Sequence, residues 1–236
     1  PTGFNLIGIV VFAPLLGVME RAIEAHIGKR GHHDLFADIS PQSVEPALLV
    51  LARETGILID RVRDYCRNPL QGRSLSRFFE EYSQVTDLKM QLADYANRLA
   101  QQPMTEGQEQ RLQRLRARVR EAVYALKALK DVADDLALLT ESHDPGLQGF
   151  SEQILRALDR LYQAPPCADL AAQHRQAMEQ LQREAYSLVA DARMRGISVL
   201  NLAREVDESG RHWLRSLAVM DDATGKGRGS GGLTGG

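Results

Sequence analysis

The sequence predicts an all-α protein in which one N-terminal membrane helix precedes two antiparallel three-helix bundles. Three observations lead to this prediction: an uncharged apolar run at the start, apolar residues that recur every three or four positions afterwards, and no alternating β pattern. Hydrophobic residues make up 44% of the chain and aromatic residues only 6%, a composition that suggests helices rich in Leu and Ala.

The first element, residues 1–27, has the composition of a membrane helix. No charged residue precedes Glu20, and the run from Phe4 to Met19 contains one clearly polar side chain, Asn5. A spanning helix needs roughly 20 residues, and apolar residues on one face extend this run to residue 27. The Lys and Arg residues that flank the run all follow it, which places the chain after about residue 28 in the cytoplasm. A buried helix of a soluble protein is the alternative interpretation.

Six helices are predicted after a linker at residues 28–42, which is rich in Gly, Pro and charged residues. Pro46 suits the first turn of the first helix, and Thr105 can cap the third, which is the longest. Turns marked by Pro or Gly separate the helices, so we expect two three-helix bundles at residues 43–143 and 144–222. A flexible Gly-rich tail follows at residues 223–236. The expected helix spans are 43–68, 74–102, 105–143, 147–163, 169–194 and 197–220.

Two side chains that often act in binding sites are predicted to be structural. His174 and Trp213 each lie on the apolar face of their predicted helix. We therefore expect His174 to be a core or boundary residue and Trp213 to be a core anchor, rather than ligands.

Charge and motif content exclude several functions. Lys and Arg total 29 and Asp and Glu total 31, a net charge of -2 that argues against a nucleic-acid partner. The two cysteines, Cys66 and Cys167, lie far apart and indicate neither a disulfide framework nor a zinc site. Since GxSxG, HExxH and CxxC motifs are all missing from the sequence, we expect that the chain is not an enzyme.

Short motifs in the first two predicted helices resemble those of a known family. Thr2, Phe4 and Asn5 form a Thr-x-Phe-Asn element, and residues 52–55 read Ala-Arg-Glu-Thr. With the order of elements, they resemble the C-terminal part of the bacterial sodium/phosphate cotransporter family. In that family a membrane transport portion precedes a cytoplasmic domain similar to PhoU, a phosphate-signalling protein of two three-helix repeats. Because the chain begins at Pro1 rather than Met, we also expect that an upstream portion is missing.

The resemblance covers the chain to about Met220 and implies a function for it. The chain would be the final membrane helix and the regulatory PhoU-like domain of a sodium-dependent phosphate transporter in the bacterial inner membrane. Sodium and phosphate would be bound by the complete transporter, because this piece lacks the family's Gln-Ser-Ser motifs. The implied partners are the upstream membrane domain, the lipid bilayer, and either a second copy or a phosphate-signalling protein. The alternative is a membrane-tethered or soluble PhoU-like adaptor in phosphate signalling, without transport activity.

The resemblance also implies a metal site. The PhoU signature is a Glu/Asp-x-x-x-Asp motif in the third helix of each repeat, and it is associated with metal clusters. Asp134 matches the family's Asp, but Lys130 replaces the first acid, while Asp131 and Asp135 have the right spacing one residue out of frame. Carboxylates four apart share a helix face, and oxygen ligands suit divalent or first-row cations. Asp131, Asp134 and Asp135 are thus the implied metal ligands, and a solvated helix face is the alternative.

Overall fold

Helices make up nearly all of the chain that the computed structural model describes, which is residues 43–67, 69–70, 75–167, 169–190 and 197–224. These residues contain seven helices and no strand, which confirms the all-α prediction for this part of the chain. The helices are α2 (Val44–Arg67), α3 (Leu75–Leu99), α4 (Glu106–Asp131), α5 (Ala133–Thr140), α6 (Pro145–Gln163), α7 (Leu170–Ala190) and α8 (Ile197–Thr224).

The predicted membrane helix at residues 1–27 and the linker at residues 28–42 lie outside the described residues, as does the tail from residue 225. Within the described ranges, no helix is both long enough and apolar enough to cross a bilayer.

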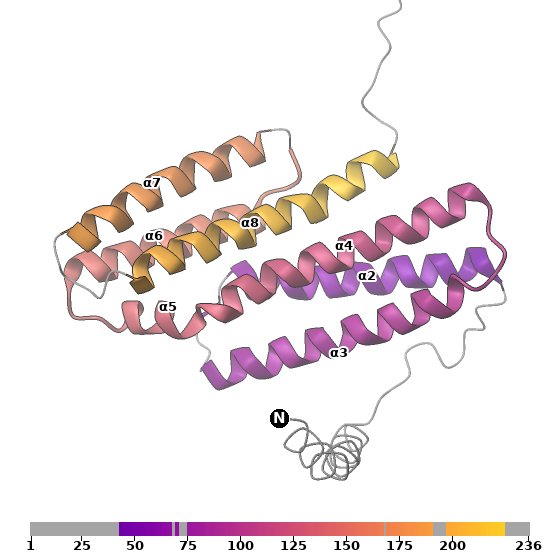
Figure 1. The fold of residues 1–236 in the computed structure, drawn as a ribbon, viewed down its shortest axis with the longest axis horizontal. Helices are drawn as coiled ribbons and strands as arrows, with labels where there is room; N and C mark the ends of the chain where they lie inside the picture. The colour runs from indigo at the N-terminus through magenta and orange to yellow at the C-terminus, as the bar shows by residue number, and fades with distance from the viewer. Residues whose placement is uncertain (1–42, 68, 71–74, 168, 191–196, 225–236) are drawn as a thin grey trace, which may run out of the picture. The chain divides into compact units, whose positions relative to one another are not determined.

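The helices pack in two groups of three that share a long contact (Figure 1). In one group α2, α3 and α4 contact one another, and in the other α6, α7 and α8 do so. Helix α4 packs along α8 in the most extensive contact between described elements, and α2 contacts α6. The short helix α5 packs against α6 and α8. Helices α4 and α8 are therefore the pair through which the two groups are mainly joined.

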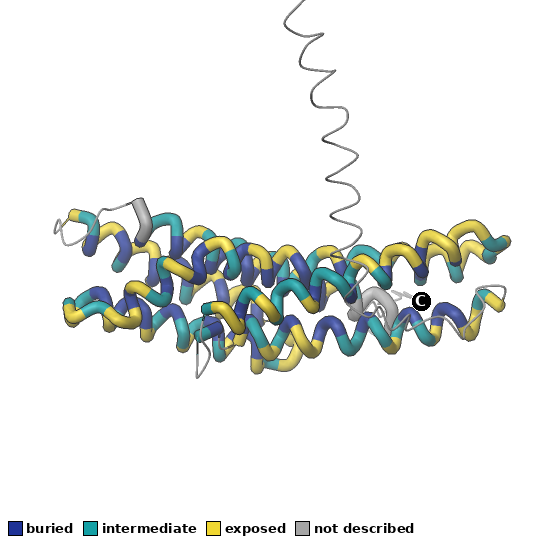
Figure 2. The backbone as a smooth tube through the Cα atoms, turned by 90° about the horizontal axis from the view of Figure 1, so that it is seen from below, coloured by how far each residue is buried: buried dark blue, intermediate teal, exposed yellow. Residues whose placement is uncertain are grey.

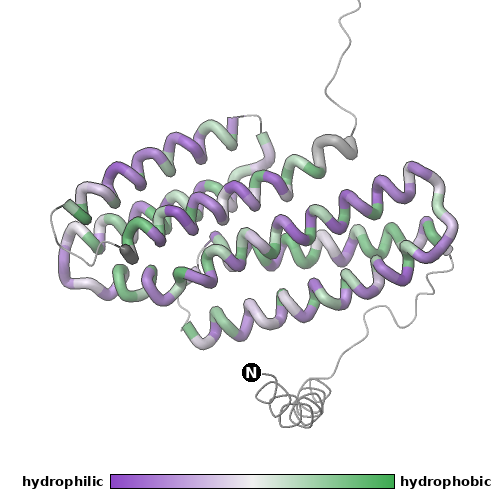
Figure 3. The backbone as a smooth tube through the Cα atoms, in the orientation of Figure 1, coloured by the Kyte–Doolittle hydropathy of each residue, from purple (hydrophilic) through white to green (hydrophobic). Residues whose placement is uncertain are grey.

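Most apolar residues of the described helices face neighbouring helices, and Figures 2 and 3 show buried and hydrophobic positions recurring along the same helices. Helix α6 illustrates the pattern, because its residues Leu147, Phe150, Ile154, Leu158 and Leu161 recur every three or four positions and are all buried. Burial of a leucine or phenylalanine side chain contributes about 1.5–3 kcal/mol relative to exposure. Packing of this face thus fixes α6 in the fold.

The two side chains predicted to be structural are buried. Trp213 on α8 is 1% exposed, and its ring centroid lies 4.9 Å from that of Tyr162 on α6. His174 on α7 is 7% exposed. These positions confirm the expectation that both residues belong to the core or its boundary.

Polar caps begin two of the helices. Thr105 caps α4 as predicted, and it forms a capping box in which its hydroxyl accepts from the Gln108 amide while the Gln108 side chain accepts from the Thr105 amide. Asp144 caps α6 by accepting from the backbone N–H groups of Gly146 and Leu147, with Pro145 in the first turn. Such caps satisfy amides that have no partner within the helix, at a gain of about 1 kcal/mol each.

The third predicted helix, residues 105–143, is divided in the structure. It bends at Val132, which has φ -123° and ψ 11° and separates α4 from α5. Val132, Ala133 and Leu136 are all at most 2% exposed, so the bend lets the chain keep its apolar side chains buried as it leaves α4 and packs on α6 and α8. Neither Gly nor Pro marks the bend, which is why the sequence pattern predicts one continuous helix.

Candidate functional site

Helix α8 carries polar side chains that contact three other helices within two turns. Asp207 contacts α7, Ser209 contacts α4 and α6, and His212 contacts α4. Ser209 is fully buried and Asp207 is 8% exposed, whereas His212 is half-buried. In this segment Ser209 and His212 bond to α4 in the other helix group, while the remaining contacts lie within the second group. Arg67 of α2 and Asp159 of α6 form a further polar contact between the groups, at 2.7 Å.

The innermost contact is a pair of buried hydrogen bonds centred on Ser209. Its Oγ donates to the backbone carbonyl of Ala125 at 2.8 Å, and the Tyr162 hydroxyl lies 2.7 Å from the same Oγ. Because the single Ser209 hydroxyl proton goes to Ala125, the Tyr162 hydroxyl is the donor in the second bond. Burial raises the pKa of Tyr162 well above its ordinary value, which keeps that proton in place. The pair connects α4, α6 and α8.

Cys66, near the end of α2, completes this buried region. It is 0% exposed, and burial raises the pKa of its thiol to about 12, although a hydrogen bond with Tyr162 acts in the opposite direction. A thiol reacts as its thiolate, which this environment suppresses at neutral pH. Cys66 thus acts as a small packing residue at the meeting point of the two helix groups.

A second polar cluster lies beside the first, between α4 and α8. Nδ1 of His212 is 2.8 Å from Glu121, and Nε2 is 3.3 Å from Glu208, so the ring stands between two carboxylates. Arg215 contacts both carboxylates, at 3.5 and 3.6 Å. Burial raises the pKa of Glu121, but the hydrogen bonds and charges of His212, Arg120 and Arg215 outweigh it and hold the pKa below its ordinary value. Glu121 is therefore a stable negative charge at the contact of α4 with α8.

A third contact joins α7 to α8. Nε2 of His174 lies 3.2 Å from Oδ1 of Asp207, and Arg211 donates to the other oxygen of that carboxylate at 2.6 Å. Burial raises the pKa of Asp207, while His174 and Arg211 lower it by more, so the net pKa lies below its ordinary value. The imidazole packs directly on Gly210, where an added Cβ would lie within 3.0 Å of three ring atoms. Only glycine allows this approach without a shift of the ring.

The structure places the three predicted metal ligands at the bend between α4 and α5. Asp131 is the last residue of α4, and its carboxylate accepts from Lys127 at 2.6 Å and from Lys130 at 3.3 Å. Asp134 and Asp135 lie in the first turn of α5. Within the described residues, no group of three or more His, Cys, Asp or Glu side chains is arranged to hold a metal ion. The ammonium groups of Lys127 and Lys130 lie beside the Asp131 carboxylate, where a bound cation would have to lie. The metal site at Asp131, Asp134 and Asp135 stays a prediction.

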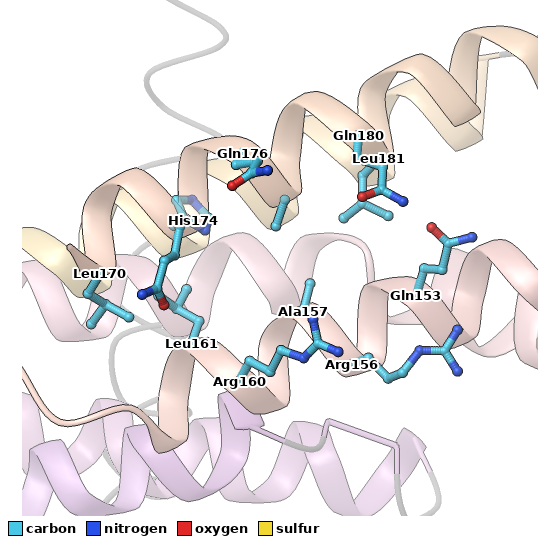
Figure 4. Close-up of a pocket in the computed structure, with 12 residues that line it drawn as sticks. Gln153, Arg156, Ala157, Arg160, Leu161, Leu170, His174, Gln176, Gln180 and Leu181 are labelled. Atoms are coloured by element: carbon cyan, nitrogen blue, oxygen red, sulfur yellow. The ribbon is translucent and has the colours of Figure 1, made fainter.

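A crevice of about 600 Å³ opens between α6 and α7 (Figure 4). Arg156 and Arg160 line it from α6, and Gln176 and Gln180 line it from α7. His174 also lines it, so the crevice lies next to the contact of α7 with α8. It is a surface site with basic and amide side chains, unlike the buried contacts of α8.

The sequence gives weak signals for these contacts. Ser209 and Gly210 are small residues on the apolar face of α8, where a polar or close contact between helices could have been suspected. Glu121 and His212 are 91 positions apart, so no periodicity relates them. Arg156 and Arg160 have the ordinary spacing of an exposed helix face, and only the separation of α6 from α7 makes them part of a crevice.

No protein-family model matches this sequence, and no curated protein or solved structure shows significant similarity to it.

Proposed function

We propose that this chain is the last membrane helix and the regulatory cytoplasmic domain of a sodium-dependent phosphate transporter. The observation that carries the proposal is the arrangement of the described helices in two successive groups of three, with α4 and α8 packed along each other. Two successive three-helix repeats are also what the resemblance to the PhoU-like domains of sodium/phosphate cotransporters implies. The Thr-x-Phe-Asn and Ala-Arg-Glu-Thr elements add support at the sequence level.

In this proposal the chain regulates transport and does not itself transport or catalyse. The upstream membrane portion moves phosphate together with sodium, and the helical domain packs against it or against a signalling partner. Residues 28–42 serve as the hinge between them, and the membrane segment at residues 1–27 keeps the domain at the bilayer.

The contacts of α8 suggest how such a domain would move. A shift of one helix group against the other would break the buried bond that Ser209 makes to the carbonyl of Ala125 and would separate His212 from Glu121. Each buried polar group left without a partner costs about 1–3 kcal/mol. The domain is thus expected to move as one body about the hinge, rather than by rearrangement between α4 and α8.

The test is sodium-dependent uptake of radiolabelled phosphate by cells that lack their own phosphate transporters. Three proteins are compared: the complete reading frame that contains this sequence, its upstream portion alone, and residues 1–236 alone. We expect uptake from the first two and none from the third. Uptake by the complete protein should also survive substitution of Asp134 better than loss of the upstream segments. Full uptake by residues 1–236 alone would contradict the proposal, and an upstream region without further membrane spans would favour the adaptor.

A further inference from the structure

The α6–α7 crevice has a lining suited to an anion. Twelve residues line it, and none of them is Asp or Glu, although acidic residues outnumber basic ones in the chain. Arg156 and Arg160 supply two positive charges, one helical turn apart on the same face of α6. Glu184 lies at the edge of the crevice, where it accepts a hydrogen bond from Gln153 at 2.8 Å, and the two arginines also line a neighbouring pocket with Asp159. An anion placed between α6 and α7 would draw the two guanidinium groups to this side of α6.

Both arginines can redirect their side chains to a ligand. Arg156 pairs with Glu152 on its own helix at 3.3 Å, but both side chains are more than half exposed, and exposed pairs of this kind are weak. Arg160 is exposed and forms no ion pair with any residue in the described ranges. Like charges one turn apart repel each other, and a bound anion would remove that repulsion. Guanidinium groups bind phosphate through paired, charge-assisted hydrogen bonds.

The rest of the lining suits an organic group attached to the anion. Leu161 on α6 and Leu181 on α7 are buried side chains that form apolar parts of the crevice. Gln176 and Gln180 line the crevice from α7, the helix opposite the one that carries the arginines, and each has a carboxamide with donors and an acceptor (Figure 4). Seven of the twelve lining residues are polar and five are apolar, so the crevice suits a polar ligand with a small apolar part, and about 600 Å³ lies within the usual size range of small-molecule sites.

We propose that the α6–α7 crevice binds a small organic phosphate. Arg156 and Arg160 hold the phosphoryl group, Leu161 and Leu181 contact the organic part, and Gln176 and Gln180 hydrogen-bond to its polar edge. This assignment does not depend on the proposed function, because the crevice lies wholly within the second helix group and its lining is independent of any membrane portion.

Isothermal titration of the full chain with AMP and with glucose 6-phosphate tests the assignment. Inorganic phosphate and adenosine are the matched probes for the two halves of the ligand. We expect at least one of the two organic phosphates to bind with a Kd of about 1 mM or tighter, and about tenfold tighter than either half. The double substitution Arg156→Gln, Arg160→Gln should weaken that binding by at least about tenfold, because it removes the charge-assisted hydrogen bonds.

The matched control is Arg175→Gln with Arg183→Gln. These arginines are exposed on α7 and do not line the crevice, so their loss changes the net charge equally and should leave the affinity within about twofold. All four positions are exposed, and circular dichroism should confirm that both variants keep the fold. The assignment is wrong if neither organic phosphate binds, if inorganic phosphate binds as tightly as both of them, or if the two double variants lose affinity equally.

Discussion

Replacing Ser209 with alanine removes the hydroxyl that joins α4, α6 and α8. The Tyr162 hydroxyl then loses its acceptor at 2.7 Å and keeps the backbone carbonyl of residue 209, at 3.4 Å. The Ala125 carbonyl loses its donor at 2.8 Å, in a region where Ser209 is 0% exposed and Tyr162 is 1% exposed. A buried polar group left unpaired costs about 1–3 kcal/mol, and the better helix propensity of alanine returns about 0.5 kcal/mol. We therefore expect a loss of about 0.5–2.5 kcal/mol in the free energy of unfolding.

Ser216→Ala is the matched control on the same helix. Ser216 is also 0% exposed, but its hydroxyl donates to the carbonyl of Trp213, three residues earlier in α8. Removing it leaves no side chain of another helix without a partner, so we expect a loss of only about 0–1 kcal/mol.

Urea unfolding followed by circular dichroism measures both variants, together with Tyr162→Phe and the double variant Ser209→Ala, Tyr162→Phe. The double-mutant cycle should give a coupling energy of about 1 kcal/mol or more, because each single change removes the same bond. If Ser209→Ala costs no more than Ser216→Ala, or if the coupling energy is within about 0.3 kcal/mol of zero, the hydrogen bonds of Ser209 do not stabilise the packing of α8 on its neighbours.

Three further predictions concern other parts of the structure. Gly210→Ala should lower the free energy of unfolding by about 1–3 kcal/mol, because the added Cβ overpacks the contact with His174. Gly56→Ala should raise it by about 0.5–1 kcal/mol, because its Cβ would meet nothing within 4 Å. Equal shifts of the melting temperature for the two variants would contradict the close approach at Gly210. The pKa of Glu121 lies below its ordinary value of 4.5, so the stability that the Glu121 carboxylate contributes is complete above about pH 4.5 and is lost as the pH falls through the folded-state pKa. The urea midpoint of Glu121→Gln should therefore fall less steeply on acidification than that of the unchanged protein. Equal slopes for the two proteins would argue against the pairing of Glu121 with His212 and Arg215. If the acidic residues at the α4–α5 bend bind a metal, Lys127→Met should tighten Mn²⁺ binding severalfold in a calorimetric titration, because it removes a competing cation. Asp134→Asn should weaken Mn²⁺ binding in the same titration. If neither variant nor the unchanged protein binds Mn²⁺, the metal site is excluded.

The helical part of the fold follows closely from local signals in the sequence. The expected spans 43–68, 74–102 and 147–163 agree with α2, α3 and α6 to within a few residues, because proline and glycine punctuate the apolar periodicity there. The cap at Thr105 was also predictable, since capping chemistry acts over three residues. The bend at Val132 was not predictable, because it results from the packing of α5 on α6 and α8 rather than from a helix-breaking residue.

The contacts of the candidate site depend on which helices become neighbours, and periodicity alone does not determine that. The burial of His174 and Trp213 could be predicted because each lies on an apolar helix face. Their partners could not, since Asp207 and Tyr162 are on other helices. The acidic residues at the α4–α5 bend were identified through a resemblance, and the two lysines that pair with Asp131 became apparent only in the structure.

The most direct test of the proposed function is the initial rate of sodium-dependent phosphate uptake by the complete protein, measured with and without residues 43–222. The proposal predicts that the shortened protein still takes up phosphate when sodium is present but no longer adjusts its rate to the phosphate supply of the cell. A complete protein that shows no sodium-dependent phosphate uptake, or one whose regulation is unchanged by the deletion, would contradict it.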